Sequence, residues 1–278
     1  CYQSISVIIP VRNEESNIAS VLDSLIFTNY PKKYLEIIVV DGASSDNTWS
    51  IIQKYKEKNS YIVAIKNQSK IVSTGFNLAL NETKGAVIIR IDGHCEIPPD
   101  YIERCIELLD SRDADIVGGS IMTESSGLIG RSIAIAQSSF FGVGGVKFRQ
   151  RNIIHPCYVD TLAFGAHKRE IFSKIGGYDE EMVCNQDDEF NYRVIKAGNK
   201  IWLEPSIKTK YFSRSSFTKL FKQYFNYGYF KVRVIQKRGK VISIRHIIPI
   251  AFILSLMLSF ISGFFLNQFW IKYFMMLL

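Results

Sequence analysis

The sequence is poor in the residue patterns that hold small metal-bound or disulfide-bonded proteins together. Its 278 residues include five cysteines, with no CxxC pair, and only four histidines, none at a zinc-site spacing. An odd number of irregularly spaced cysteines argues against a disulfide framework or a zinc ribbon and favours incidental thiols in a reducing compartment. Hydrophobic residues make up 47% of the chain and charged residues 22%, which predicts a folded chain with one large or two small cores.

Three short motifs that mark common enzyme classes are also absent. No G-x-G-x-x-G follows the first predicted strand, which argues against a dinucleotide-dependent enzyme. No G-x-x-x-x-G-K-[ST] occurs, which argues against a P-loop enzyme. No G-x-S-x-G occurs, which argues against an esterase.

Acidic residues are missing from the last quarter of the chain. Residues 205–278 contain 12 Lys and Arg and no Asp or Glu, so residues 1–204 contain the other 22 basic residues and all 26 acidic ones. Residues 1–204, called the body here, are therefore mildly acidic, and residues 205–278, called the tail, are strongly basic. Nucleic-acid-binding proteins more often spread positive charge over the folded domain, so we expect no nucleic-acid partner. Basic charge just before the most apolar part of a chain is typical of a membrane protein.

The apolar part runs from Ile247 to Ile271 without a charge. A helix over Ile247–Leu266 would match the thickness of the hydrocarbon core, so we expect a transmembrane helix there. Phe269–Leu278 resembles the start of a second span that the sequence cuts short. A buried helix of a soluble domain is the alternative, but such helices rarely run this long without a charge.

A basic and aromatic segment, residues 216–246, precedes the apolar part. This mixture suits a helix lying in the membrane interface, and a solvated helix packed on the body is an equally weighted alternative. By the positive-inside rule the segment stays cytoplasmic. No N-terminal signal peptide is visible, so we expect the body to face the cytoplasm from the inner membrane.

The body alternates short β-branched runs with helical patterns through residue 117, as in a doubly wound, mostly parallel α/β sheet. Residues 118–156 are rich in Gly and Ser and predict a long, partly mobile segment, with Lys147, Arg149 and Arg151 near its end. The expected strands are Ile5–Ile9, Leu35–Val40, Tyr61–Ile65, Ala86–Ile91 and Ala114–Val117, and the expected helices lie near 14–27, 47–58, 72–82, 99–110, 168–175 and 187–197.

Polar residues gather where these strands end, which is where such sheets bind ligands. The first strand runs into Pro10-Val11-Arg12-Asn13-Glu14, the second into Asp41 and the fourth into Asp92. Asp41 could accept a hydrogen bond from a base or a ribose. Asp92 and His94 are two residues apart, so in an extended stretch they share a face and could bind a divalent ion. Each feature alone is also explained by turn or capping roles.

A third polar cluster is Gln186-Asp187-Asp188-Glu189, at the start of a predicted helix. The helix dipole alone would explain three acids there. The functional interpretation is that one carboxylate is a general base for an attacking hydroxyl.

Together these motifs resemble glycosyltransferase family 2 from about Ser4 to Lys231. The resemblance implies an A-type glycosyltransferase fold. It makes SVIIPVRNEESNI and VVDGASSDNT part of a nucleotide site, with Asp41 as the uracil contact and Pro10, Arg12, Asn13 and Glu14 at its border. It places Asp92 against the ribose and a metal, Mn²⁺ or Mg²⁺, with His94 as second metal ligand in place of the usual Asp.

The same resemblance assigns the acceptor side. GAHKREIFSKIGGYDEE, which contains Gly165 and Ala166, is similar to the segment before the family's catalytic helix. NQDDEFNYRVIKAG is similar to the Glu-Asp motif, with Gln186 in the Glu position, Asp187 as base and Asp188 as the adjacent alternative. Arg193 matches a basic position after the motif.

Within the family, the Asp-x-His and RSSFTKLFKQYFNYGYFK are most similar to membrane-anchored enzymes of bacterial exopolysaccharide synthesis, such as the succinoglycan type. The Gln-x-x-Arg-Trp of processive synthases is missing, because Gln223 is followed by Tyr224-Phe225-Asn226-Tyr227. This argues against a cellulose- or hyaluronan-type polymerase.

We therefore expect a cytoplasmic glycosyltransferase domain over 1–215, with a nucleotide half 1–117 and an acceptor half 118–215, then the interfacial segment 216–246 and the membrane region 247–278. The enzyme would be inverting and move a hexose from a UDP-sugar to a hydroxyl of a lipid-linked saccharide, alongside polysaccharide-assembly proteins. Two alternatives are a polyprenyl-phosphate glycosyltransferase and a non-catalytic, membrane-tethered nucleotide-sugar binding subunit.

Overall fold

The structure is a computed structural model, and it describes residues 2–139, 142, 145–213, 216–238, 248–265 and 276. The chain divides into a large unit, Cys1–Val234, and a small unit, Ile235–Leu278. Residues 239–246 of the expected basic and aromatic segment and residues 266–275 of the expected membrane region lie outside the described residues.

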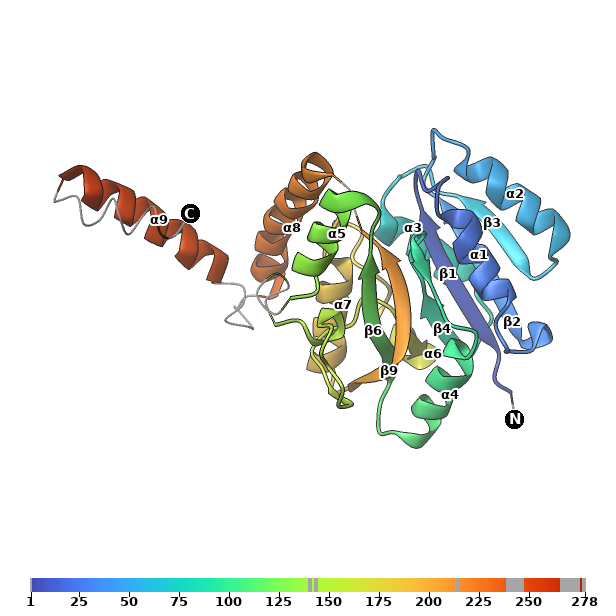
Figure 1. The fold of residues 1–278 in the computed structure, drawn as a ribbon. Helices are drawn as coiled ribbons and strands as arrows, with labels where there is room; N and C mark the ends of the chain where they lie inside the picture. The colour runs from blue at the N-terminus through green and yellow to red at the C-terminus, as the bar shows by residue number, and fades with distance from the viewer. Residues whose placement is uncertain are drawn as a thin grey trace. The chain divides into compact units, whose positions relative to one another are not determined.

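The first half of the large unit is a parallel sheet in the order β3-β2-β1-β4, and it confirms the predicted βαβα pattern (Figure 1). Strands β1, β2 and β4 are buried and rich in Ile and Val, as strands covered on both faces require, whereas the edge strand β3 is partly exposed. The register pairs Pro10 with Val40 and Val11 with Asp41, so the strand ends lie level. The bounds are β1 Ile5–Val11, α1 Ile18–Ile26, β2 Leu35–Asp41, α2 Thr48–Lys58, β3 Ile62–Lys66, α3 Val72–Glu82 and β4 Val87–Arg90.

The second half of the sheet is mixed, so the expectation of a mostly parallel sheet is wrong there. Strand β8 (Gly165–Lys168) is antiparallel to both β4 and β6 (Ile116–Glu124), whereas β9 (Ile201–Phe212) is parallel to β6. The short strands β5 (Cys95–Glu96) and β7 (Cys157–Tyr158) are antiparallel to β9. The sequence pattern missed β9 because Pro205 interrupts it. The β6–β9 register shifts between Gly119 and Ser120, so the proline sits where the regular ladder is broken.

Gly118 and Gly119 lie inside β6, not in the mobile segment that their composition predicted. A Cβ on Gly119 would stand 2.1 Å from the carbonyl oxygen of Ile207, and one on Gly118 would stand 2.4 Å from that of Phe164. Glycine is therefore needed at these positions because the backbones approach closely. In the sequence alone, such glycines look the same as glycines that mark a turn.

Replacing Gly119 with Ala should destabilise the fold by about 1–3 kcal/mol, because backbone must move to admit the methyl group. The matched control is Gly228→Ala in the exposed part of α8 (Phe217–Arg238), where an added Cβ meets nothing within 4 Å. That change should stabilise the helix by roughly 1 kcal/mol. Urea unfolding midpoints measure both, and equal midpoints for the two variants would contradict the close approach.

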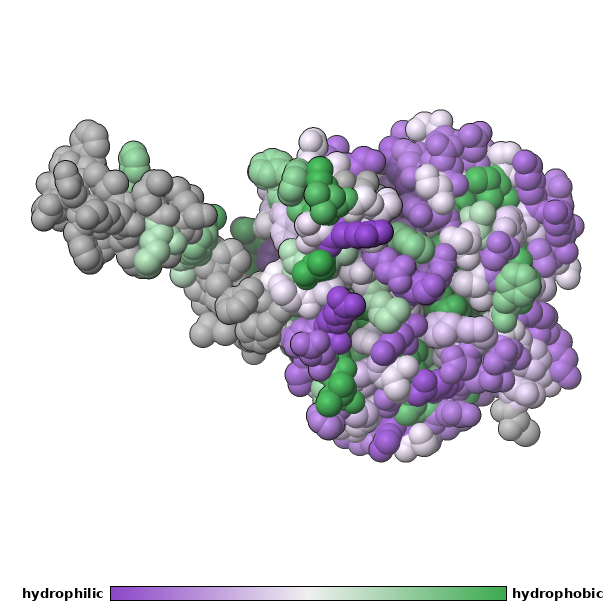
Figure 2. All heavy atoms as spheres, viewed as in Figure 1, coloured by the Kyte–Doolittle hydropathy of each residue, from purple (hydrophilic) through white to green (hydrophobic). Residues whose placement is uncertain are grey.

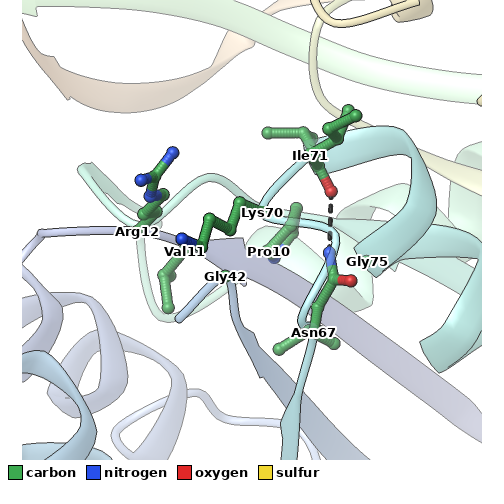
Figure 3. Close-up of a pocket in the computed structure, with 10 residues that line it drawn as sticks. Pro10, Val11, Arg12, Gly42, Asn67, Lys70, Ile71 and Gly75 are labelled. Carbon is green, nitrogen blue, oxygen red and sulfur yellow. Dashed lines mark hydrogen bonds between the residues drawn. The ribbon is translucent and has the colours of Figure 1, made fainter. Parts of the chain in front are cut away.

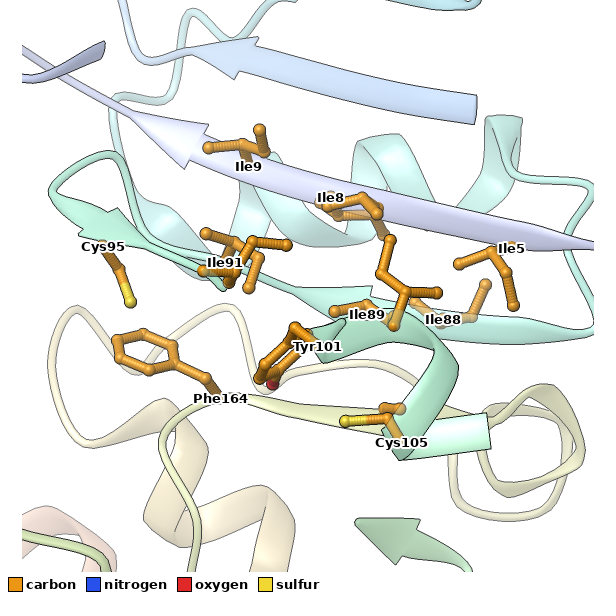
Figure 4. Close-up of a cluster of buried hydrophobic side chains, with 14 of the residues drawn as sticks. Ile5, Ile8, Ile9, Ile88, Ile89, Ile91, Cys95, Tyr101, Cys105 and Phe164 are labelled. Atoms are coloured by element: carbon orange, nitrogen blue, oxygen red, sulfur yellow. The ribbon is translucent and has the colours of Figure 1, made fainter. Parts of the chain in front are cut away.

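Helices cover the second half of the sheet: α4 Tyr101–Ser111, α5 Gly127–Ala136, α6 Arg169–Ile175 and α7 Gln186–Lys196. The core between β1, β4 and α4 consists of isoleucines packed against Tyr101 and Cys105 (Figure 4). Burial raises the pKa of the Cys105 thiol to about 12, which fits the prediction of an inert, incidental thiol.

A second cluster, made of aromatic rings, joins the two halves and fixes the start of α7. Tyr178 stacks on Phe76 of α3 with ring centres 4.3 Å apart and meets Phe190 of α7 edge-on at 5.1 Å. Phe172 of α6 stacks on Phe190, also at 5.1 Å. These contacts position α7 from both halves of the domain.

The small unit contains α9 (Ile248–Phe265), whose apolar side chains are largely exposed, for example Phe252, Leu258 and Phe260. Within the residues that the structure describes, no helix has the length and apolarity needed to cross a membrane. The expected transmembrane helix over Ile247–Leu266 is therefore not confirmed, and both of its end residues lie outside the described part.

Candidate active site

A small, shallow pocket opens where β1 and β2 end (Figure 3). Two cations, Arg12 and Lys70, lie near each other at one side, and Asn67 and Ile71 lie at the other, joined by a 2.9 Å hydrogen bond from Asn67 Nδ2 to the Ile71 carbonyl. A hollow with two cations suits an anionic ligand. The full lining is Pro10, Val11, Arg12, Val40, Gly42, Asn67, Lys70, Ile71, Val72 and Gly75.

The loops after β1 and β2 are tied together beside this pocket. Asp41 is 1% exposed and accepts hydrogen bonds from the Ser44 hydroxyl at 2.5 Å and the Ser44 amide at 3.2 Å. Asn13 has a left-handed backbone with φ of 55°. Its backbone N–H donates to Ser44 Oγ at 2.9 Å, and its side-chain Oδ1 accepts from the backbone N–H of Ser45 at 2.9 Å. These contacts hold Asp41 and Asn13 in place, and their nucleotide contacts stay predictions.

Asp92 follows β4 on the other side of β1 and is paired with a buried arginine. Arg90 Nε and Nη2 both donate to Asp92 Oδ1, at 3.1 and 2.9 Å, which leaves Oδ2 for another ligand. Arg90 Nη1 also reaches the Tyr178 hydroxyl at 3.4 Å. The Arg90 side chain is 5% exposed and that of Asp92 is 23% exposed, so only the carboxylate reaches solvent.

His94 is oriented by Glu14. Its Nδ1 lies 3.0 Å from Glu14 Oε1, and Glu14 Oε2 accepts from Asn17 Nδ2 at 3.0 Å. A carboxylate accepts, so this contact places the proton on Nδ1 and leaves Nε2 as a donor for a metal. The geometry gives Glu14 a positioning role, and its predicted nucleotide contact stays a prediction.

Asp92 and His94 fit a divalent ion that is shared with a substrate. No cluster of three or more metal-ligating side chains occurs among the described residues. Sites for Mg²⁺ commonly have one or two protein ligands, with phosphate and water oxygens completing the shell. Asp92, with the carboxylate oxygen that Arg90 leaves open, and His94, held by Glu14, match that pattern. Because they supply one oxygen and one nitrogen ligand, the pair suits Mn²⁺ as well.

Asp187 lies in the first turn of α7. Burial raises its pKa above the ordinary value, the guanidinium of Arg90 opposes the shift, and the carboxylate of Asp188 adds to it. The residue before the helix, Asn185, is held at φ 59° and donates Nδ2 to the Tyr227 carbonyl at 3.0 Å. A left-handed non-glycine residue two positions before a carboxylate with a raised pKa points to a functional site.

Asp188, the alternative base, faces another partner. Its Oδ2 is 2.5 Å from Lys231 Nζ of α8, and their side chains are 14% and 28% exposed. Gln186 is 6% exposed, and its Oε1 is buried without a hydrogen-bond partner among the described residues. Because Lys231 holds Asp188, Asp187 is the better placed of the two acids.

The remaining acceptor-side residues lie within the framework. Gly165 and Ala166 are buried in β8 opposite Arg90 and Ile89. Arg193 is bound to the Glu189 carboxylate at 2.8 Å and donates to the carbonyls of Ile175 and Gly177. The structure therefore does not bring Arg193 together with Asp92 and Asp187, and an acceptor contact of its side chain stays a prediction.

Arg90 belongs to none of the motifs above, although the sequence carries a signal for it. Arg90 is the one charged residue in the apolar run Ala86–Ile91, and a charge inside a buried strand needs a partner. Of the three loop cations, only Arg149 turns inward: it lies 5.3 Å from the Tyr211 ring centre and interacts with the charge of Asp187. Lys147 and Arg151 are exposed.

A parallel half joined to a mixed half is also the arrangement of the solved glycosyltransferases reported below. The chain belongs to glycosyltransferase family 2: the family model described as Glycosyl transferase family 2 matches residues 6–176. It is therefore a glycosyltransferase of polysaccharide or other glycan synthesis.

Two relatives match most of the chain. The succinoglycan biosynthesis protein ExoA of Rhizobium meliloti is 30% identical over 88% of this chain and 74% of its own length. The dolichyl N-acetyl-alpha-D-glucosaminyl phosphate 3-beta-D-2,3-diacetamido-2,3-dideoxy-beta-D-glucuronosyltransferase of Methanococcus voltae is 28% identical over 93% of this chain and 82% of its own.

Solved structures support the fold. A mannosyltransferase of Pyrobaculum calidifontis, in complex with GDP-Man and Mn²⁺, matches with a TM-score of 0.57 and 19% identity over 75% of this chain. Residues 1–349 of S. aureus TarS, in complex with UDP, match with a TM-score of 0.55 and 20% identity over 76% of this chain. This chain covers only 56% and 60% of those two solved chains.

Proposed function

We propose that this enzyme is an inverting glycosyltransferase that moves a hexose from a UDP-sugar to a hydroxyl of a lipid-linked saccharide in bacterial polysaccharide synthesis. The observation that carries the proposal is the placement of Arg90. Its guanidinium pairs with Asp92 and also acts on the charge of Asp187, so the carboxylate on the donor side and the candidate base lie around one buried cation.

Asp187 takes the proton of the acceptor hydroxyl. The acceptor oxygen then bonds to the anomeric carbon, the bond from that carbon to the diphosphate oxygen breaks, and its electron pair leaves with UDP. Attack opposite the leaving group inverts the anomeric configuration. A raised pKa makes Asp187 a stronger base than an ordinary aspartate.

Asp92 Oδ2 and His94 Nε2 would hold Mn²⁺ or Mg²⁺. When bound, such an ion neutralises negative charge on the departing diphosphate. Pro10, Arg12, Asn13 and Asp41 would bind the nucleotide beside the pocket, where Arg12 and Lys70 supply positive charge.

Relatives support the donor and acceptor classes. TarS is solved with UDP and with UDP-GlcNAc, and the mannosyltransferase of P. calidifontis with a nucleotide-sugar and Mn²⁺. The name of the M. voltae relative describes a dolichyl-phosphate-linked sugar as acceptor, which favours a lipid-linked saccharide here. We place the reaction at the cytoplasmic face of the inner membrane, beside polysaccharide-assembly proteins, on the strength of the basic and aromatic residues of α8.

Calorimetric titration of UDP into the full chain, with and without Mn²⁺, tests the donor site. We expect binding to depend on Mn²⁺ and to be lost in Asp92→Ala. Glu14→Ala should weaken Mn²⁺ binding about 10–100-fold, because it removes the acceptor that orients His94. The matched control is Glu57→Ala, at an exposed residue of α2. If a folded sample binds UDP equally in all variants, the donor assignment is wrong.

A further inference from the structure

The outer faces of α5 and α8 carry large exposed apolar side chains. In α8 these recur every three to four residues, so they share one side of the helix. They are Phe217, Phe221, Tyr224, Phe225, Tyr229 and Val232, each between 45% and 73% exposed. In α5 they are Leu128, Ile129 and Ile135, at 85%, 45% and 65% exposed. We call these two helix surfaces the α5–α8 face.

The topology places the two helices at the same end of the sheet. Strands β6 and β9 are parallel neighbours that end level, with Glu124 paired to Phe212, and α5 and α8 start three and five residues later. The Tyr224 hydroxyl of α8 donates to the carbonyl of Gly142, in the segment that follows α5, at 3.5 Å. Both helices lie on the same side of the sheet in Figure 1, and apolar residues gather over them in Figure 2.

The two chain segments that build this face contain no acidic residue. Residues 125–159 contain Arg131, Lys147, Arg149 and Arg151, and residues 205–278 contain 12 basic residues, with no Asp or Glu in either. Two segments distant in sequence thus share the same one-sided charge. On the surface itself, Arg131 of α5 and Lys222 and Arg233 of α8 are exposed beside the apolar side chains.

We propose that the α5–α8 face docks onto an anionic lipid surface. Exposed aromatic residues flanked by Lys and Arg are what the lipid headgroup region accommodates, with rings at the boundary and cations on the phosphates. A protein-binding surface would instead be depleted in Lys at its apolar centre. The occupant is thus a bilayer that contains acidic phospholipids.

Docking of this face would also bring the first turn of α7, which carries Asp187, close to the membrane. This step rests on the proposed function. The inner side of α8 holds the start of α7 through the Lys231–Asp188 ion pair and through the bond from Asn185 to the Tyr227 carbonyl. Asp187 lies between these two contacts in sequence. A face bound to lipid therefore keeps the base beside the surface from which a lipid-linked acceptor would arrive.

The test uses the full chain with vesicles of phosphatidylcholine, with or without phosphatidylglycerol. Each cation near an acidic surface contributes about fivefold to affinity. Lys222→Gln with Arg233→Gln should therefore weaken binding to the acidic vesicles about thirtyfold and leave binding to neutral vesicles unchanged. The matched control is Lys54→Gln with Lys56→Gln, on exposed positions of α2, which should bind acidic vesicles as the parent does.

A second readout locates the face itself. Leu128→Trp and Phe221→Trp should be quenched by brominated lipid more strongly than the parent chain, whereas Phe27→Trp, at another exposed apolar position (73%), should not. No added quenching at positions 128 and 221 in vesicle-bound chain would overturn the proposal, as would equal affinities of the Gln variants. UDP binding and sugar transfer are measured on the same samples, so a chain that docks but transfers no sugar would refute only the proposed function.

Discussion

Replacing Asp187 with Asn should lower kcat for sugar transfer by about 10²–10⁴-fold, the range of a lost general base. The amide cannot accept the acceptor's proton, but it keeps the shape of the side chain. UDP should still bind nearly as tightly, since Asp41 and Asp92 lie on other elements. Single-turnover transfer and UDP titration measure the two effects separately.

The neighbouring carboxylate is the matched control for this substitution. Asp188→Asn removes the partner of Lys231 and should cost far less activity than Asp187→Asn. Should Asp188→Asn abolish transfer while Asp187→Asn retains it, Asp188 is the base. Full activity in both variants would favour an acceptor that is already ionised, such as a lipid phosphate.

The raised pKa of Asp187 also sets the pH dependence of kcat. Below that pKa the carboxyl is protonated and cannot accept a proton, so activity is lost as pH falls through it. Because burial raises the pKa, this loss should begin at a higher pH than an ordinary aspartate would give. The fall of kcat at low pH, the acid limb of the kcat profile, is measured over a pH series and gives this pKa of Asp187.

Replacing Arg90 with Met should have the second large effect. The change leaves Asp92 and Asp187 without their shared cation, in a site where the Arg90 side chain is 5% exposed. Because the Asp92 carboxylate that loses its partner is partly exposed, the change should cost about 1–3 kcal/mol, and the variant should unfold at lower urea. Loss of the cation that opposes the shift should also raise the pKa of Asp187 further and move the acid limb to higher pH.

The control for Arg90 is Arg104→Met. Arg104 forms an i,i+4 contact with Asp100 at 3.9 Å, and both side chains are at least 35% exposed. Its other contacts are two surface hydrogen bonds to Ser206, at 2.6 and 3.3 Å. Exposed pairs contribute about 0–1 kcal/mol, so stability should change little and the acid limb should stay in place. An Arg90→Met variant whose kcat profile keeps the parent's acid limb would show that Arg90 does not act on the base.

The parallel half could be predicted from sequence because its strands are short, β-branched runs that must be buried on both faces. Strand β9 could not, because Pro205 and the charged residues after it disguise a strand that alternates buried and exposed positions. Gly118 and Gly119 led to the wrong prediction of a mobile segment. Only the close approach of the Ile207 and Phe164 carbonyl oxygens in the structure shows why glycine is needed there.

The candidate site shows a similar division. Motif spacing located Asp41, Asp92, His94 and Asp187, and strand order explains why the first two flank β1. The partners could not be read from spacing, because Glu14 reaches His94 across 80 residues and Lys231 reaches Asp188 across 43. Such contacts depend on how β9 returns the chain to the sheet and delivers α8 to α7.

The Lys231–Asp188 pair has a consequence for exchanging parts between relatives. A chimera joined at the end of β9 would bring a foreign α8 against the native α7, and Asp188 would lose its cation wherever that helix has no basic residue at position 231. The compact unit extends to Val234, past this contact. Donor specificity is therefore best swapped among family members as a block that ends after residue 234, so that each catalytic helix travels with the helix that braces it.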